Sequence, residues 1–130
     1  MKRAAFIGRF QPFHNGHAWL IDQKLSQGCP ILILVRDTPT DPANPFTTAQ
    51  VVGMIQEVYH DQDVIVQIIP DIDSVNYGRG VGYGVVEHVP PSDIGRVSAT
   101  QIREGVRQGD DSWKANVNPR IHRTLESLLR

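Results

Sequence analysis

The sequence predicts an α/β fold with an open, mainly parallel sheet, and three observations lead to it. Residues 4–7, 31–35 and 64–69 are short apolar segments with the length of buried strands. The first two are each followed by a segment whose apolar residues recur at helical spacing. The resulting order of strand, helix, strand, helix and strand favours parallel pairing through right-handed crossovers.

The first predicted helix carries Ala18, Ile21 and Leu25 on one face. It ends near Gly28, because glycine tolerates the left-handed conformation that follows many helices. The strand at 31–35 then consists of five consecutive apolar residues. Such a run is typical of a strand that is covered on both faces of a parallel sheet.

The second predicted helix begins at Thr47, after a polar loop over residues 37–45. Thr47 and Gln50 have the spacing of a capping box, and Phe46 and Val51 have the spacing of a hydrophobic staple. Both patterns fix the point at which a helix starts.

The second half of the chain is less regular. Ser98 and Gln101 have the spacing of a second capping box, and Asn118 followed by Pro119 is typical of a helix start. The expected elements are a glycine-rich loop over 76–84, a strand over 85–89, a helix from 98 to about 109 and a last helix from about 119.

Composition narrows the class of protein. The chain has 130 residues with 13 Lys+Arg and 14 Asp+Glu, so it is expected to form one domain over 1–130 and not to coat nucleic acid. Cys29 is the only cysteine, which excludes an internal disulfide and the Cys-rich zinc modules. No apolar run approaches the ~18 residues of a membrane span. A cytoplasmic location, away from the membrane, is therefore expected.

The first chemistry-bearing segment is GRFQPFHNGH, residues 8–17, at the end of the first strand, where parallel sheets bind ligands. Gly8 is expected to let a ligand approach the backbone, and Arg9 offers a fork of donors for phosphate oxygens. Gly16 leaves the helix N-terminus open to an anion. His14 and His17 lie three residues apart and are expected to face the same end. The alternative for either one alone is a helix cap or a solvated side chain. Zinc binding is disfavoured, because no third ligand lies nearby.

The second such segment is a predicted helix start. Ser98 caps it, and its first turn carries Thr100 and Arg103, so hydroxyls, free N–H groups and a guanidinium converge on a second anion site. The alternative is an ordinary surface helix with a capping serine and solvated arginines.

These two segments resemble the signatures of the HxGH nucleotidyltransferases. Residue by residue, GRFQPFHNGH resembles most the first signature of the archaeal-type nicotinamide mononucleotide adenylyltransferases. SATQIR at 98–103 resembles their second signature. Residues 44–47, 70–73 and 117–119 resemble further family segments in the same order. The similarity therefore touches nearly the whole chain.

The resemblance implies a Rossmann-like three-layer fold and transfer of a nucleotidyl group from a nucleoside triphosphate. Mg²⁺ would be bound mainly through the triphosphate, with no metal site made of protein ligands. His14, His17 and Arg103 are the expected catalytic residues. The expected nucleotide-binding residues are Gly8, Arg9, Phe10, Phe13, Gly16, Ser98 and Thr100.

Four further residues are candidates for binding the acceptor. Asp71 and Asp73 follow a strand end and suit an amide or hydroxyl group, or the placing of Mg²⁺, although solvated loop carboxylates are an equal alternative. Arg36 ends the second strand and suits an acceptor phosphate. Tyr77 is a candidate for stacking on the acceptor base, with simple packing as the more common role of a lone loop tyrosine.

The reaction predicted first joins ATP to nicotinamide mononucleotide, giving NAD and pyrophosphate. The alternatives are the same transfer to another small phosphate-bearing acceptor, a transfer from CTP, and a non-catalytic module that only binds nucleotide. A homo-oligomer is left open, with the apolar last helix as a candidate contact.

The chain departs from the family pattern in three places. Gln50 and Val51 stand where a Glu-Arg pair is usual, and Ala99 replaces a usual Gly or Ser. Between Tyr83 and Ser98, only about a dozen residues fill a stretch where the family has a further strand and helix. A deleted unit is therefore expected.

Overall fold

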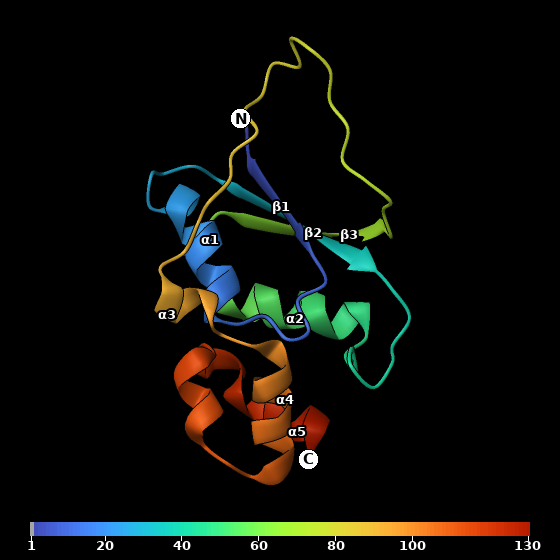
Figure 1. Ribbon diagram of the computed structural model, residues 1–130, viewed down its shortest axis with the longest axis vertical. Helices are drawn as coiled ribbons and strands as arrows, with labels where there is room; N and C mark the ends of the chain where they lie inside the picture. Colours follow the sequence, from blue (N-terminus) through green and yellow to red (C-terminus); the bar gives the residue numbers. More distant parts are fainter. Residues whose placement is uncertain (1) are drawn as a thin grey trace.

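Three parallel strands form the centre of the computed structural model, which describes residues 2–130 (Figure 1). β2 pairs with both of its neighbours, in the order β1-β2-β3, and the predicted open parallel sheet is confirmed. The first half contains β1 (Ala4–Gly8), α1 (Asn15–Leu25), β2 (Ile31–Asp37), α2 (Thr48–Val58) and β3 (Val64–Pro70). The second half contains α3 (Ser92–Gly95), α4 (Ala99–Gln108), η1 (Ser112–Asn116), η2 (Pro119–Ile121) and α5 (His122–Leu129).

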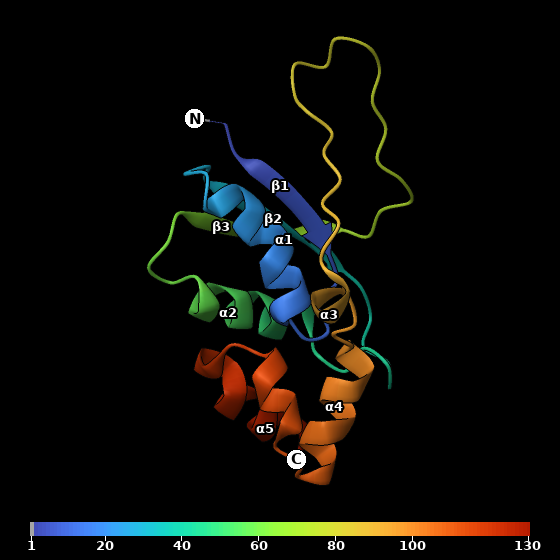
Figure 2. The same cartoon turned by 60° about the vertical axis from the view of Figure 1, so that its left-hand side comes forward.

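The helices α1 and α2 lie on the same face of the sheet (Figures 1 and 2). Both crossovers advance in the same direction, from β1 to β2 to β3, and right-handed connections in one direction place their helices on one side. Ile31, Ile33 and Val35 point into the core on this side and are no more than 1% exposed. Leu32 and Leu34 point to the other side, which carries no helix in residues 2–130. The expectation that 31–35 is covered on both faces is wrong.

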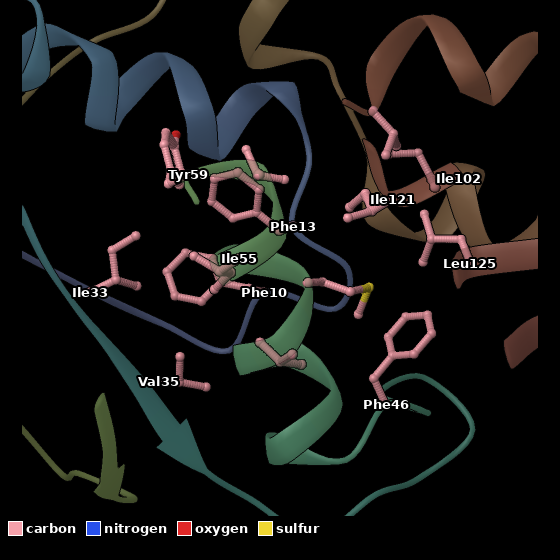
Figure 3. Close-up of a cluster of buried hydrophobic side chains, with 14 of the residues drawn as sticks. Phe10, Phe13, Ile33, Val35, Phe46, Ile55, Tyr59, Ile102, Ile121 and Leu125 are labelled. Carbon is pink, nitrogen blue, oxygen red and sulfur yellow. The ribbon is translucent and has the colours of Figure 1, made fainter. Parts of the chain in front are cut away.

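The C-terminal helices form a further layer beneath α2. Figure 3 shows Ile102, Ile121 and Leu125 pointing from this layer towards the aromatic side chains at the end of β1 and the start of α2. All three are at most 1% exposed. The layers therefore follow the order sheet, helix, helix, and the α/β class is as predicted.

Residues 71–91 contain no helix or strand and extend away from the sheet on the side opposite α2 (Figures 1 and 2). The strand expected at 85–89 is not formed. Val85, Val86 and Val89 are between 57% and 73% exposed, and no backbone hydrogen bond joins 71–90 to a strand of the described chain. Apolar composition alone does not make a strand when no neighbouring edge accepts its hydrogen bonds.

The predicted helix starts are largely as observed. Thr47 and Gln50 form both bonds of the capping box, at 3.1 and 2.9 Å, and Phe46 and Val51 are both buried. At α4 the box is half-formed, because the Ser98 hydroxyl accepts from the Gln101 N–H but the Gln101 side chain makes no return bond. None of the helices within residues 2–130 is long and apolar enough to span a membrane.

Candidate active site

The loop from β1 to α1 turns sharply at Phe10, whose φ of 52° lies in the left-handed region. The turn folds the Phe10 ring back over Gly8, where an added Cβ would lie 2.8 Å from the ring. Glycine is therefore needed at position 8 to make room for Phe10. The expectation that Gly8 admits a ligand to the backbone gains no support, because this side chain already fills the space.

The two histidines cap α1 reciprocally. Nδ1 of His14 accepts a hydrogen bond from the Gly16 N–H at 3.0 Å, and Nδ1 of His17 accepts from the His14 N–H at 3.2 Å. Their rings stack with centroids 3.8 Å apart and planes 17° from parallel. A Cβ at Gly16 would come within 2.8 Å of the His14 ring, so glycine is required there as well.

This capping arrangement determines the tautomer of both rings. A neutral imidazole carries one proton, and an Nδ1 that accepts a hydrogen bond leaves that proton on Nε2. Within residues 2–130, neither Nε2 has a hydrogen-bond partner. The pair therefore presents two N–H donors, turned away from the backbone that they cap.

Burial keeps both rings neutral. It lowers the pKa of His14 from 6.5 to about 4, with a backbone hydrogen bond opposing the shift. Burial, together with the smaller effect of the neighbouring His14, lowers the pKa of His17 to about 3. An anion next to the two Nε2–H groups would favour protonation, so ligand binding is expected to raise both pKa values.

Phe10 and Phe13 support His17 from the core. Their ring centroids lie 4.9 and 5.6 Å from that of His17, and the two side chains are 7% and 1% exposed. Figure 3 shows both rings among the buried aliphatic side chains. Both rings thus pack beneath the histidine, and their expected part in nucleotide binding stays a prediction.

The second expected anion site directly adjoins the first. Nη1 of Arg103 donates to the carbonyl of Gln11 at 2.6 Å, and Nη2 donates to the Thr100 hydroxyl at 3.3 Å. These bonds bring together segments that lie 92 positions apart in the chain. Arg103 is only 7% exposed, so this contact holds the guanidinium against the histidine loop. The convergence predicted for the two segments is present.

Gln11 was not expected to belong to the site, yet it links a third segment to it. Its side chain donates to the Phe46 carbonyl at 2.9 Å and accepts from the Phe46 N–H at 3.0 Å. A glutamine amide can match a backbone group in this way because it carries both a donor and an acceptor. The sequence offered one sign of this role, because Gln11 is a polar residue within the otherwise apolar run Phe10 to Phe13.

The N-terminus of α4 adjoins this junction, with Ser98 half-buried and Thr100 exposed. Ser98 donates no bond within the described chain, and its oxygen accepts from the Gln101 N–H at 3.3 Å. The other first-turn N–H groups have no partner inside the helix, as at any helix start. Ser98 and Thr100 therefore remain candidates for binding an anion.

The proposed acceptor residues are only partly brought together. Arg36 and Asp71 form an ion pair, with Nε and Nη2 of the arginine 2.8 and 2.7 Å from the same carboxylate oxygen. The hydrogen bond from Arg36 is the main reason that the pKa of Asp71 lies below its usual value, and the charge of Arg9 adds to it. Asp73 and Tyr77 lie on the exposed segment 71–91 and contact none of these groups.

Protein ligands for a metal ion are scarce around this site. No group of three His, Cys, Asp or Glu side chains within residues 2–130 is arranged to hold one. The nearby carboxylates are already engaged, Asp71 with Arg36 and Asp41 with Asn44. This donor set suits a metal ion that arrives with its phosphate ligands.

Residues 5–89 match the family model described as cytidylyltransferase-like. The chain belongs to this cytidylyltransferase-like family, and the nucleotidyltransferase class predicted from the two signatures is confirmed. Among its relatives, a nicotinamide-nucleotide adenylyltransferase of Caldivirga maquilingensis is 27% identical over 98% of this chain and 89% of the relative. A protein of the same name from Methanospirillum hungatei JF-1 is 36% identical over 58% of this chain and 44% of the relative.

An uncharacterized protein of Aeropyrum pernix is also similar, with 25% identity over 97% of this chain and 92% of the relative. The comparison with the Caldivirga protein extends over 159 positions, whereas the whole chain has 130 residues. At least 159 − 130 = 29 of those positions therefore have no counterpart in this chain. This difference supports the predicted deletion, and the lack of any strand between β3 and α3 agrees with it.

Replacing Gln11 by leucine is expected to destabilise the fold. The change leaves the buried N–H and carbonyl of Phe46 without partners, at a cost of about 3 kcal/mol in the free energy of unfolding. Urea denaturation measures it. Gln56→Leu, on the exposed face of α2, is the matched control and should change stability by less than about 0.5 kcal/mol. Equal effects of the two substitutions would contradict a role for the Gln11 amide.

Stability should fall as the pH drops below 6.5. The unfolded chain then protonates His14 and His17, whereas the folded chain resists protonation until about pH 4 and pH 3. The free energy of unfolding should decrease by up to about 1.4 kcal/mol per pH unit for each histidine.

Urea denaturation between pH 5 and pH 7 checks this dependence. His17→Asn should flatten it, and His60→Gln, at an exposed histidine, should not. An unchanged slope in His17→Asn would rule out burial of a neutral His17.

Proposed function

We propose that the chain transfers a nucleotidyl group from ATP to a small phosphate-bearing acceptor, with nicotinamide mononucleotide as the first candidate. The names of the Caldivirga and Methanospirillum relatives support this acceptor. A cytoplasmic location belongs to the same proposal.

One observation carries the proposal. Two imidazoles with free Nε2–H groups follow the loop residue Gln11, and the bond from Arg103 to the Gln11 carbonyl joins this loop to α4. A triphosphate needs donors spaced along its length, and uncharged N–H groups, helix N-termini and hydroxyls all supply them.

His14 and His17 are proposed to donate their Nε2–H groups to the phosphate oxygens around the reacting phosphorus. Ser98, Thr100 and the first-turn N–H groups of α4 are proposed to bind the outer phosphates. Arg103 is proposed to bind the departing pyrophosphate, and its bonds to Gln11 and Thr100 hold the guanidinium beside the Thr100 hydroxyl. Arg9 is proposed to donate to phosphate oxygens of the nucleotide, and the Arg36–Asp71 pair is a candidate for contacts with the acceptor.

The reaction requires no nucleophile from the protein. An oxygen of the acceptor phosphate forms a bond to the α-phosphorus, and the bond from that phosphorus to the bridging oxygen of the β-phosphate breaks. Pyrophosphate leaves with the bonding electron pair. Negative charge grows on the α-phosphoryl oxygens and on the leaving group, where the imidazole and α4 donors are proposed to stabilise it. Mg²⁺, when bound through the triphosphate, would neutralise part of that charge.

A panel of ATP and CTP against several phosphate-ester acceptors tests the reaction. We expect pyrophosphate release with ATP and nicotinamide mononucleotide, and a product with the mass of NAD. A product with CTP or with another ester would support the alternative substrates. Saturable binding of ATP without release under any combination would identify a nucleotide-binding module and overturn the proposal.

Two substitutions at His17 separate catalysis from folding. Asparagine can keep the acceptor that caps α1 but lacks a group at the Nε2 position, whereas glutamine can place an N–H donor there. His17→Asn is expected to lower kcat by about 10²–10³-fold, the loss typical of one transition-state donor.

His17→Gln should recover part of that activity, and thermal melts establish that both variants are folded. Equal activity of the wild type and His17→Asn would remove the His17 Nε2–H group from the mechanism.

A further inference from the structure

Asn15 is the first residue of α1 and lies between the two histidines of the candidate site. Both caps of α1 span this position, because the His14 ring accepts from the Gly16 N–H and the His17 ring accepts from the His14 N–H. A displacement of the backbone at Asn15 therefore moves both imidazoles together.

The Asn15 side chain ties this turn to the C-terminal layer. Its Nδ2 donates to the carbonyl of Ala115 in η1 at 3.0 Å, across 100 positions of the chain. The bond from Arg103 to Gln11 joins the same loop to α4 a few residues earlier. The segment that carries the histidines is thus tethered twice, once before the pair and once within it.

The acceptor of the Asn15 bond belongs to a well-ordered turn. The carbonyls on the two sides of Ala115 both accept from Nε2 of His122, which is the donor because a carbonyl has no proton to give. They belong to Lys114 and Val117 and lie 3.1 and 2.8 Å from that nitrogen. Trp113 of the same turn is only 3% exposed, and its ring meets the His122 ring edge-on at 5.1 Å. The Ala115 carbonyl is therefore held in place before Asn15 reaches it.

The turn η1 and the helix α4 pack against each other. Gly105 of α4 faces Trp113 so closely that an added Cβ would lie 3.2 Å from the indole Cδ1. Only residues 109–111 connect the two elements along the chain. Both tethers of the histidine loop, at Gln11 and at Asn15, therefore end on one packed unit, and this unit carries the N-terminus of α4.

We propose that Asn15 is a positioning residue for the imidazole pair, and that its bond to Ala115 aims both Nε2–H groups at the phosphates bound at the start of α4. The inference rests on the proposed nucleotidyl transfer. In such a reaction the donors must match the charge that grows on the phosphoryl oxygens, and a displacement of about 1 Å can cost a factor of 10² in rate. Asn15 itself touches no reacting atom. The competing role of the bond is to stabilise the fold alone.

Asn15→Ala tests this role through kcat and KM, with ATP and the acceptor that supports the wild-type reaction. We expect kcat to fall about 10-fold, the effect of one hydrogen bond of ordinary strength, and KM for ATP to stay within about 2-fold. Asn15→Gln keeps the amide donor on a longer side chain and should recover part of the loss. Thermal melts establish that both variants are folded.

Gln23→Ala is the matched control on the same helix. The Gln23 amide also donates to a backbone carbonyl, that of Trp19 at 2.8 Å, but this bond lies within α1 itself. Its loss is expected to leave kcat unchanged, because it does not join α1 to the C-terminal layer.

Hydrogen exchange provides a readout that does not require turnover. NMR of the nucleotide-free protein follows the backbone N–H groups of His14 and Gly16, which the caps protect. Both are expected to exchange about 10-fold faster in Asn15→Ala than in the wild type or in Gln23→Ala, because the capped turn opens more often without its tether.

Wild-type activity decides the reaction, and the variants decide the role of Asn15. A wild type that releases no pyrophosphate with any substrate pair overturns the proposed reaction, and the exchange rates then decide whether Asn15 holds the pair. An active wild type with the same kcat in Asn15→Ala overturns the positioning role and leaves the reaction standing. The role is also overturned by a rise in KM for ATP alone, by an equal loss of kcat in Gln23→Ala, or by unchanged exchange of both N–H groups.

Discussion

The hydrogen bond from Arg103 to the Gln11 carbonyl holds the candidate site together. It joins the loop after β1 to the first turn of α4, and the Gln11 side chain extends the same junction to Phe46 at the start of α2. Hydrogen bonds from charged donors contribute about 1.5–3 kcal/mol, and more is lost when a buried partner is left unpaired. Three segments distant in sequence thus meet at one residue, and the relative positions of the imidazoles and the α4 N-terminus depend on it.

The electrostatics of the site follow from burial and capping together. Burial keeps His14 and His17 uncharged at neutral pH, and the caps of α1 occupy both Nδ1 atoms. The consequence is a pair of preoriented N–H donors that do not repel each other, as two imidazolium ions at the same separation would. Neutral N–H groups and a helix N-terminus are both donors that suit an anion.

The sheet of this chain has helices on only one of its two faces within residues 2–130. The strand order is β1-β2-β3, and right-handed crossovers that all run in this direction place their helices on one face. Helices on the other face would require a crossover from β1 to a strand on its other side. The longer Caldivirga and Aeropyrum relatives have additional residues for which this chain has none. The two signature segments still contact each other near the carboxyl end of β1, through the bond from Arg103 to Gln11.

The sequence by itself determined the elements whose causes are local: the three strands, the capping box at Thr47, the glycine stop at Gly28 and the reciprocal placement of two histidines at a helix start. Only the tertiary structure decided which of these groups are buried and which are free to bind. The Phe10 ring packs against His17, and Arg103 donates one of its hydrogen bonds to the Gln11 carbonyl. Residues 85–89 lie outside the sheet. Each of these outcomes depends on a partner far along the chain, and neither periodicity nor spacing within one segment identifies such a partner.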